Sequence, residues 1–281
     1  MDSKEFGLVA AQQLFQIEDL HYGYWDDNVA VSLSNYKQAQ RRYTEFLFNY
    51  IDKYILNKSS SKILDVGCGV GLTTKKLLES GYNVDGLVPS TWMSKYAEDI
   101  IGDLKNEDRG KIYESTFEDF PISNNKKYDL IFFSESYQYI NMEQAYRIIE
   151  KVSTENTKII IFDFFRKDNI EGKSPLGGGH SIGKFYDITK NNNFKILEDI
   201  DVTKKLSPNM KLVNDVIKDR VLPFTKTLDS FMLSRHRFIY KMIRFLLRKK
   251  IDKFKFKYSS ERNEENFIKY KTYRLIVLNK N

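Results

Sequence analysis

Residues 63–71, which read ILDVGCGVG, constrain this chain more than any other stretch. A short apolar run ends in an acidic residue, three glycines follow at alternate positions, and an amphipathic segment begins at Leu72. Glycine adopts positive φ and lets a ligand approach the backbone where a Cβ would block it. The pattern predicts a parallel strand, a tight loop and a helix N-terminus, the place where open α/β sheets bind nucleotide-like ligands.

The spacing of the glycines indicates the kind of ligand. A dinucleotide fingerprint requires glycine at the sixth position of G-x-G-x-x-G, where this chain has Leu72. A phosphate-binding P-loop requires a lysine after the loop, and Leu72 and Thr73 follow Gly71 instead. Asp65 at the strand tip would repel a phosphate but suits a ligand that carries an ammonium group. A tight strand-to-helix turn without any ligand is the alternative.

Strand and helix patterns alternate beyond residue 62. The sequence predicts strands over 62–66, 83–88, 111–115, 128–133 and 157–163, and helices over 71–80, 91–104, 141–153 and 181–192. Two further strands are expected over 194–202 and 267–278, and helices over 7–19 and 39–57 near the N-terminus. This alternation predicts an α/β fold with a mainly parallel sheet covered on both faces.

Composition limits the cellular setting of the protein. The chain has 281 residues, one cysteine and a formal net charge of +7, so no internal disulfide forms and the basic excess is mild. Asp2, Lys4 and Glu5 interrupt the N-terminus before any apolar run, so no secretory signal is expected. We therefore expect a cytoplasmic protein. No spacing among cysteines, histidines and acids suggests a metal site.

The glycine motif resembles the first motif of class I S-adenosylmethionine-dependent methyltransferases, D-V-G-C-G-x-G. The segment His21–Trp25 (HYGYW) is similar to the H-x-G-Y-W element of their small-molecule branch, which includes tocopherol C-methyltransferases and natural-product sugar O-methyltransferases. The resemblance implies a Rossmann-like sheet of seven strands with an antiparallel last strand, and S-adenosyl-L-methionine as cofactor. It also implies that Tyr22 reaches the site from a lid; an aromatic plug at a helix break is the alternative.

The resemblance assigns the cofactor to Tyr22 and to a set of positions at and just after the tips of the first four strands. They are Tyr22, Asp65, Gly67, Cys68, Gly69, Gly71, Leu87, Val88, Thr116, Phe117 and Ser134. Two of them depart from the family pattern, because relatives place acids where Val88 and Thr116 stand. Residues 86–90 (GLVPS) form the tip of the second predicted strand and follow the pattern G-[IL]-x-x-S without an acid. This pattern resembles the cyclopropane-synthase and tocopherol-methyltransferase branch. Asp85 faces the other side of its strand and cannot replace the missing acid.

The turn after the fourth strand, residues 128–139, resembles F-D-x-V-x-x-x-E-S-x-x-H of these enzymes. Glu135 fits the pattern, but Gln138 and Tyr139 stand where O-methyltransferases carry their general-base histidine. We therefore expect a carbon or nitrogen acceptor, or a hydroxyl deprotonated by Glu135 or Tyr22. The predicted substrate-facing residues are Tyr22, Glu135, Gln138 and His180, the last after the glycine run 177–179.

Basic and apolar residues interleave over 235–257. An amphipathic lid with a solvated charged face is one interpretation; contact with a membrane surface or an anionic lipid is another, and RNA binding is the third. Nucleic acid is disfavoured as a substrate, because no proline follows the fourth strand as it does in amino methyltransferases of nucleic acids. The oligomeric state stays open, a homo-oligomer included.

The predicted organisation is an N-terminal helical lid (1–60), a methyltransferase core (61–203 and 261–281) and a helical lid insertion (204–260). The predicted function is methylation of a hydrophobic small molecule, natural-product or lipid-like, at carbon, nitrogen or oxygen. Two alternatives remain: a protein that binds the cofactor without methyl transfer, as a cyclase or scaffold, and an RNA methyltransferase.

Overall fold

The computed structural model describes residues 9, 12, 19, 21–106, 109–123, 126–257 and 261–280. For residues 243, 247 and 250–257 it describes the backbone alone. The helix predicted over 7–19 lies almost entirely outside these residues.

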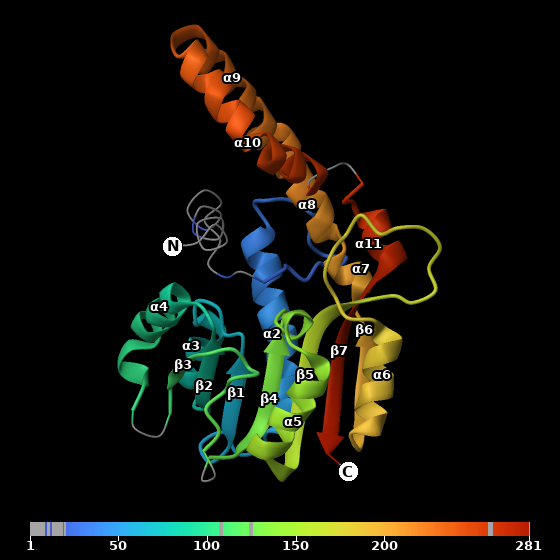
Figure 1. Ribbon diagram of the computed structural model, residues 1–281. Helices are drawn as coiled ribbons and strands as arrows, with labels where there is room; N and C mark the ends of the chain where they lie inside the picture. Colours follow the sequence, from blue (N-terminus) through green and yellow to red (C-terminus); the bar gives the residue numbers. More distant parts are fainter. Residues whose placement is uncertain are drawn as a thin grey trace.

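A seven-stranded sheet forms the centre of the molecule, in the order β3-β2-β1-β4-β5-β7-β6 (Figure 1). Its strands are β1 (Lys62–Val66), β2 (Asn83–Val88), β3 (Ile112–Glu114), β4 (Tyr128–Ser134), β5 (Ser153–Arg166), β6 (Phe194–Asp201) and β7 (Lys271–Lys280). The first five run parallel, and β7 runs antiparallel to both β5 and β6. The predicted seven-stranded α/β sheet with an antiparallel last strand is confirmed.

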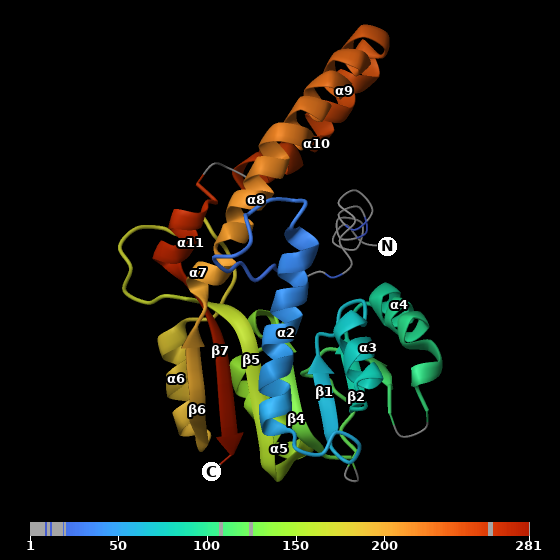
Figure 2. The same ribbon diagram turned by 180° about the vertical axis from the view of Figure 1, so that it is seen from behind.

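Helices cover both faces of the sheet. One apolar core joins the sheet to α2 (Tyr36–Tyr54), α3 (Leu72–Glu79) and α4 (Thr91–Ile101), and the other joins it to α5 (Met142–Val152) and α6 (Ile182–Asn191). Figure 2 shows α2 and α3 in front of the sheet, and Figure 1 shows α5 and α6 on the opposite side. The central strands are mostly apolar on both faces because both faces are buried under helices.

Several elements differ in their bounds from the sequence-based expectation. α2 covers Tyr36–Tyr54 where 39–57 was expected, and α4 ends at Ile101 and not at residue 104. The larger of the other differences lie after β4. β5 begins at Ser153 and not at residue 157. Residues 267–270 were expected in the last strand but end α11 (Glu264–Tyr270). The Asn263 side chain caps this helix by accepting a hydrogen bond from the Asn266 N–H, so β7 begins only at Lys271.

The insertion consists of consecutive helices above the carboxyl ends of the parallel strands. They are α7 (Thr203–Leu206), α8 (Pro208–Val216), the π-helical turn Ile217–Val221, α9 (Leu222–Arg235) and α10 (Arg237–Lys257). α9 and α10 form a hairpin that projects away from the sheet in both views (Figures 1 and 2). Among the described residues, no helix is both long and apolar enough to cross a bilayer.

Gly67 joins the tips of two strands at van der Waals distance. Its φ is +83°, and a Cβ at this position would lie 2.3 Å from Ser136 Cβ. The Ser136 hydroxyl in turn donates to the Val66 carbonyl, which ties the end of β4 to the end of β1. Gly71 also has positive φ, and a Cβ there would lie 2.8 Å from Ala97 Cβ on α4. These two glycines are therefore required by the packing of the loop.

We predict that Gly67→Ala destabilises the fold far more than Gly81→Ala. Gly81 also has positive φ (+90°), but a Cβ at this position would have no atom within 4 Å, so alanine there adds backbone strain alone, about 1 kcal/mol. Gly67→Ala adds a steric overlap of the kind that costs about 1–3 kcal/mol. Urea unfolding of the two variants measures the difference. Equal losses of unfolding free energy would contradict the packing role.

Candidate active site

The carboxyl ends of β1, β2 and β4 meet at one edge of the sheet, where the glycine loop turns into α3. The amides of Gly67 and Cys68 both donate to the Leu87 carbonyl at the tip of β2, at 2.8 and 3.0 Å. Gly69 also has positive φ, +58°. The Cys68 side chain is buried against Gly86, and burial raises the pKa of its thiol well above the usual range. Cys68 is thus a packed, protonated thiol, as expected of a loop residue without a nucleophilic role.

Asp65 is a buried carboxylate under this loop, with 2% of its surface exposed. It accepts one hydrogen bond, 2.7 Å from the Thr74 hydroxyl, and has no cation beside it in the described part of the chain. Burial, opposed by the Thr74 hydrogen bond and assisted by the charge of Asp19, raises the pKa of Asp65 to about 7. A buried acid with a single donor is costly unless a positive group neutralises it. The position therefore fits a ligand with an ammonium group.

Glu135 follows β4 in the left-handed region, with φ +55°. Such a backbone is uncommon for a non-glycine residue and is concentrated at functional sites. Its Oε1 accepts from the Tyr22 amide and the Tyr273 hydroxyl, each at 2.9 Å. Its Oε2 has no hydrogen-bond partner among the described residues. Burial raises the pKa of Glu135 above its ordinary value.

Hydroxyl groups from three distant segments meet beside Glu135. The Tyr43 hydroxyl of α2 lies 2.9 Å from Ser134 Oγ and 3.1 Å from the Tyr273 hydroxyl of β7. The His21 ring stacks on Tyr43 with centroids 4.2 Å apart. Burial lowers the pKa of His21, but the carboxylates of Asp19 and Glu135 outweigh it and raise that pKa above its usual value. The predicted site residues Tyr22, Ser134 and Glu135 are brought together here.

Two side-chain amides hold residues 21–25 across this edge. Gln40 of α2 donates to the His21 carbonyl at 2.8 Å. Asn209 of α8 accepts from the Gly23 amide and the Trp25 indole, and it donates to the Gly23 carbonyl. The segment is therefore fastened on one side to the core and on the other to the insertion, and it covers the hydroxyl cluster.

The other predicted cofactor residues line the tips of β2 and β3. Val88 is buried at the end of β2. Thr116 is exposed, and its hydroxyl donates to Asp119 at 2.8 Å. Phe117 packs edge-on against Phe133 with centroids 5.3 Å apart and is almost fully buried, so its ring serves the core and offers little surface for stacking. Asp85 pairs with Lys126 and faces away from the site, as predicted.

Gln138 and His180 are engaged with the protein itself. Gln138 donates from its amide and its Nε2 to Asp163 of β5, at 2.9 and 3.1 Å. His180 Nε2 lies 2.9 Å from the Ile140 carbonyl and 3.1 Å from that of Tyr137, so this nitrogen carries the proton. Both contacts fix the turn after β4 to its neighbours. These polar atoms thus position the turn, and the expectation that Gln138 and His180 face a substrate stays a prediction.

Several residues of the site were missed by the sequence analysis. Asp163 is fully buried, and burial raises its pKa to about 8 despite three donors. Lys271 is 1% exposed and donates to the Gly178 carbonyl at 2.5 Å, which holds the glycine run. Burial lowers the pKa of Lys271 to about 8, helped by the charges of Arg166 and Arg262. A charged residue inside an apolar strand pattern was the signal available for both.

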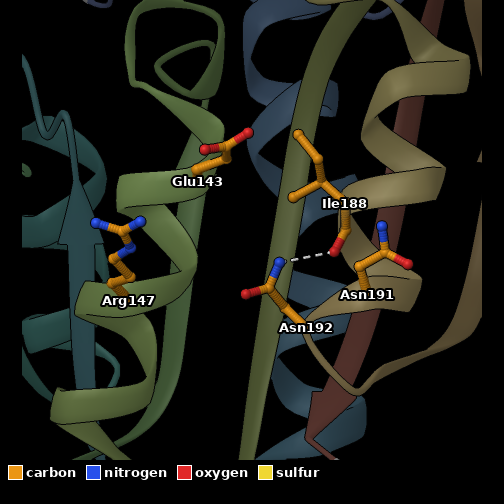
Figure 3. A pocket seen from close by; sticks show the side chains of 5 residues that line it. All are labelled: Glu143, Arg147, Ile188, Asn191 and Asn192. Atoms are coloured by element: carbon orange, nitrogen blue, oxygen red, sulfur yellow. Dashed lines mark hydrogen bonds between the residues drawn. The ribbon is translucent and has the colours of Figure 1, made fainter.

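Within the described ranges, no three histidine, cysteine or acidic side chains are arranged to hold a metal ion. A surface pocket between α5 and α6 is lined by Glu143, Arg147, Ile188, Asn191 and Asn192 (Figure 3). It lies on the outer side of the helices and contains none of the residues described above. The buried carboxyl groups of Asp65 and Glu135 lie at the sheet edge and not around this pocket.

Known proteins that are similar to this chain include several methyltransferases. Residues 63–154 match the family model described as a methyltransferase domain. An uncharacterized methyltransferase of Geobacillus sp. (strain WCH70) is 31% identical over 51% of this chain and 66% of its own length. The chloroplastic tocopherol O-methyltransferase of Arabidopsis thaliana is 24% identical over 57% of this chain and 47% of its own. The chain thus spans less than two thirds of the length of each of these two relatives.

Solved structures extend the likeness to the whole fold. A structure from Galdieria sulphuraria, assigned to a sarcosine dimethylglycine methyltransferase, has a TM-score of 0.71 at 18% identity and covers 100% of this chain and 98% of its own. Geranyl diphosphate C-methyltransferase from Streptomyces coelicolor A3(2), in complex with S-adenosyl-L-homocysteine, has a TM-score of 0.67 at 14% identity, covering 96% and 92%. Residues 63–154 thus match a methyltransferase domain, and the chain as a whole has the fold of the class I S-adenosylmethionine-dependent methyltransferases.

Proposed function

We propose that the protein transfers a methyl group from S-adenosylmethionine to a hydrophobic small molecule. The observation that carries this proposal is Glu135, held in a left-handed conformation at the tip of β4 with one carboxylate oxygen bound by Tyr22 and Tyr273 and the other without a partner among the described residues. This places a group that can accept a proton beside the glycine loop. The tocopherol methyltransferase and the geranyl diphosphate enzyme, by their names, act on small molecules, which supports the same class of acceptor.

The residues around the loop fit the cofactor. Asp65 would bind the ammonium group, and the backbone of Gly67–Gly71 would lie under the methionine part, since positive φ at all three glycines brings the main chain close. Tyr22, Leu87, Val88, Thr116 and Ser134 border the same edge. When bound, the cofactor supplies an electrophilic methyl group attached to a sulfonium.

Glu135 would hold the acceptor and take its proton at Oε2. The raised pKa brings this carboxyl nearer to the working pH, which favours a general base. The Tyr273 hydroxyl and the Tyr22 amide fix the rotamer of the side chain. Much of the rate would come from alignment in a closed, water-poor site, since residues 21–25 cover it. Tyr22 itself stays protonated, because burial raises the pKa of its hydroxyl far above the usual value.

A small hydrophobic acceptor suits the surface better than RNA does. Partly buried aromatic rings of Tyr22 and Phe164 border the edge, and the ring of Tyr139 is 78% exposed. Residues 222–257 contain eleven Lys and Arg and two Asp, a net charge of +9, whereas the whole chain carries +7. The remainder, which includes the site, is therefore at −2, so the basic excess lies away from the proposed reaction.

Cofactor affinity should rise with pH through the titration of Asp65. The folded pKa of about 7 lies above the ordinary value for aspartate, so the free carboxyl is mostly protonated at pH 6 and mostly ionised at pH 8. Binding an ammonium requires the ionised form, so the affinity for S-adenosylhomocysteine should increase about tenfold over this range. Calorimetric titration of wild type and Asp65→Asn measures it. The variant should bind weakly, with no such slope; an unchanged slope would contradict the role of Asp65.

Glu135→Gln should lower the turnover of methyl transfer by about 10²–10³-fold, since the amide cannot take a proton. The affinity for S-adenosylhomocysteine should change less than about threefold, because Glu135 is proposed to bind the acceptor and not the cofactor. Labelled S-adenosylmethionine offered with isoprenoid, polyketide-like and phenolic acceptors provides the assay. Glu143→Gln is the matched control, because Glu143 lies on α5 outside the site. Tight cofactor binding by wild type without transfer to any acceptor would favour a cyclase instead.

A further inference from the structure

The hairpin of α9 and α10 carries large apolar side chains that the rest of the protein leaves uncovered. Phe238 is 89% exposed and Phe245 is 77% exposed. Others on the hairpin share this exposure: Leu222, Phe224, Leu228, Phe231, Leu233, Ile239, Met242 and Leu246. Single exposed apolar residues are ordinary, but ten of them on one hairpin mark a candidate interaction surface.

The outward face of α10 is defined by its contacts with α9. Tyr240 and Arg244 face α9, because the Tyr240 hydroxyl donates to Asp229 and Arg244 Nη1 lies 3.7 Å from the same carboxylate. At about 100° per residue, Phe238, Met242 and Phe245 lie about 140–160° around the helix from Tyr240. Their face therefore points away from α9. We name Phe238, Met242 and Phe245 the outer face.

Cations flank the outer face. Lys241 is exposed and lies about 60° around the helix from Phe238, and Arg237 is exposed about 100° from it. The net charge of +9 on residues 222–257 belongs largely to α10, which contains nine of the eleven basic residues. Aromatic and aliphatic side chains beside exposed Lys and Arg suit the interface of an anionic bilayer, where the rings enter the acyl boundary and the cations reach the phosphates.

The arrangement also permits such contact. The hairpin projects away from the sheet and from α2–α6 in both views, so its faces are not covered by the body (Figures 1 and 2). A protein partner or a second copy of the chain would need a negatively charged surface to match, whereas the body of this chain carries a net charge of only −2. Charge complementarity therefore favours an anionic lipid surface.

We propose that the α9–α10 hairpin docks the protein on anionic membranes, with the outer face in the acyl boundary and the flanking cations on lipid phosphates. This inference does not depend on the methyl-transfer activity. It places the proposed site beside a source of hydrophobic acceptors.

The test is co-sedimentation of the full chain with vesicles of phosphatidylcholine, alone or with phosphatidylglycerol. Wild type should partition at least about tenfold more strongly onto the anionic vesicles, since each basic residue near such a surface adds to the attraction. High salt should reduce this partition. Phe238→Ser/Phe245→Ser should weaken it by at least about tenfold, because two rings lose their burial. Lys241→Glu should weaken it as well.

Two matched controls separate the outer face from general surface effects. Leu56→Ser removes an apolar side chain that is 96% exposed but lies on the body after α2, and Lys190→Glu reverses an exposed charge on α6. Both should leave the partition within about twofold of wild type, if docking depends on the hairpin. All variants are checked for thermal unfolding and for S-adenosylhomocysteine binding, which the hairpin variants should retain. A failure of membrane docking is thus distinguishable from a failure of the proposed activity.

Four results would overturn the proposal. One is the absence of binding to any vesicle, and another is binding that the Phe238→Ser/Phe245→Ser variant leaves unchanged. The third is a dimer in solution that the same variant dissociates, with no partition onto vesicles, which would assign the outer face to a second copy. The fourth is salt-dependent RNA binding that the Phe238→Ser/Phe245→Ser variant leaves unchanged, with no binding to vesicles. This result would assign the hairpin to nucleic acid and not to a membrane.

Discussion

The attachment of residues 21–25 across the carboxyl edge of the sheet is the interaction on which the rest of the site depends. Gln40 and Asn209 supply hydrogen bonds to this segment from two elements that are far apart in sequence. The attachment directs the Tyr22 amide at Glu135 and stacks His21 on Tyr43. Without it, the Glu135 carboxylate would lose one of its two donors, and water would enter the edge.

The glycine loop forms the other half of the site. Packing against its neighbours holds this loop in one conformation. Gly67 lies against Ser136 and Gly71 against Ala97, so the loop is clamped between β4 and α4. The Leu87 carbonyl binds two of its amides. The loop and Glu135 are thus fixed by the same contact, since Ser136 directly follows Glu135 in the chain. A rigid loop and a rigid acid at adjacent strand tips are what alignment of a methyl donor and an acceptor requires.

The sequence predicted the sheet well because each central strand is a short segment rich in apolar residues between turn residues, as in residues 62–66 and 83–88, whose predicted bounds match β1 and β2. Tyr43 and Tyr273 could not be found in this way. Each lies in the apolar pattern of a helix or a strand, and their hydroxyls meet only because α2 crosses the sheet beside β7. For the same reason, spacing alone could not show that Gln138 lies over Asp163 of β5 and is bound to it. Local pattern predicts elements, whereas polar partners depend on tertiary packing.

The most direct test of the central claim is amide hydrogen exchange with and without S-adenosylhomocysteine. The structure predicts that the ligand protects the glycine loop, residues 67–71, and the covering segment, residues 21–25, because both border one site. Protection confined to α5 and α6 around the pocket of Figure 3, or none at saturating ligand, would contradict the placement of the active site at the carboxyl edge.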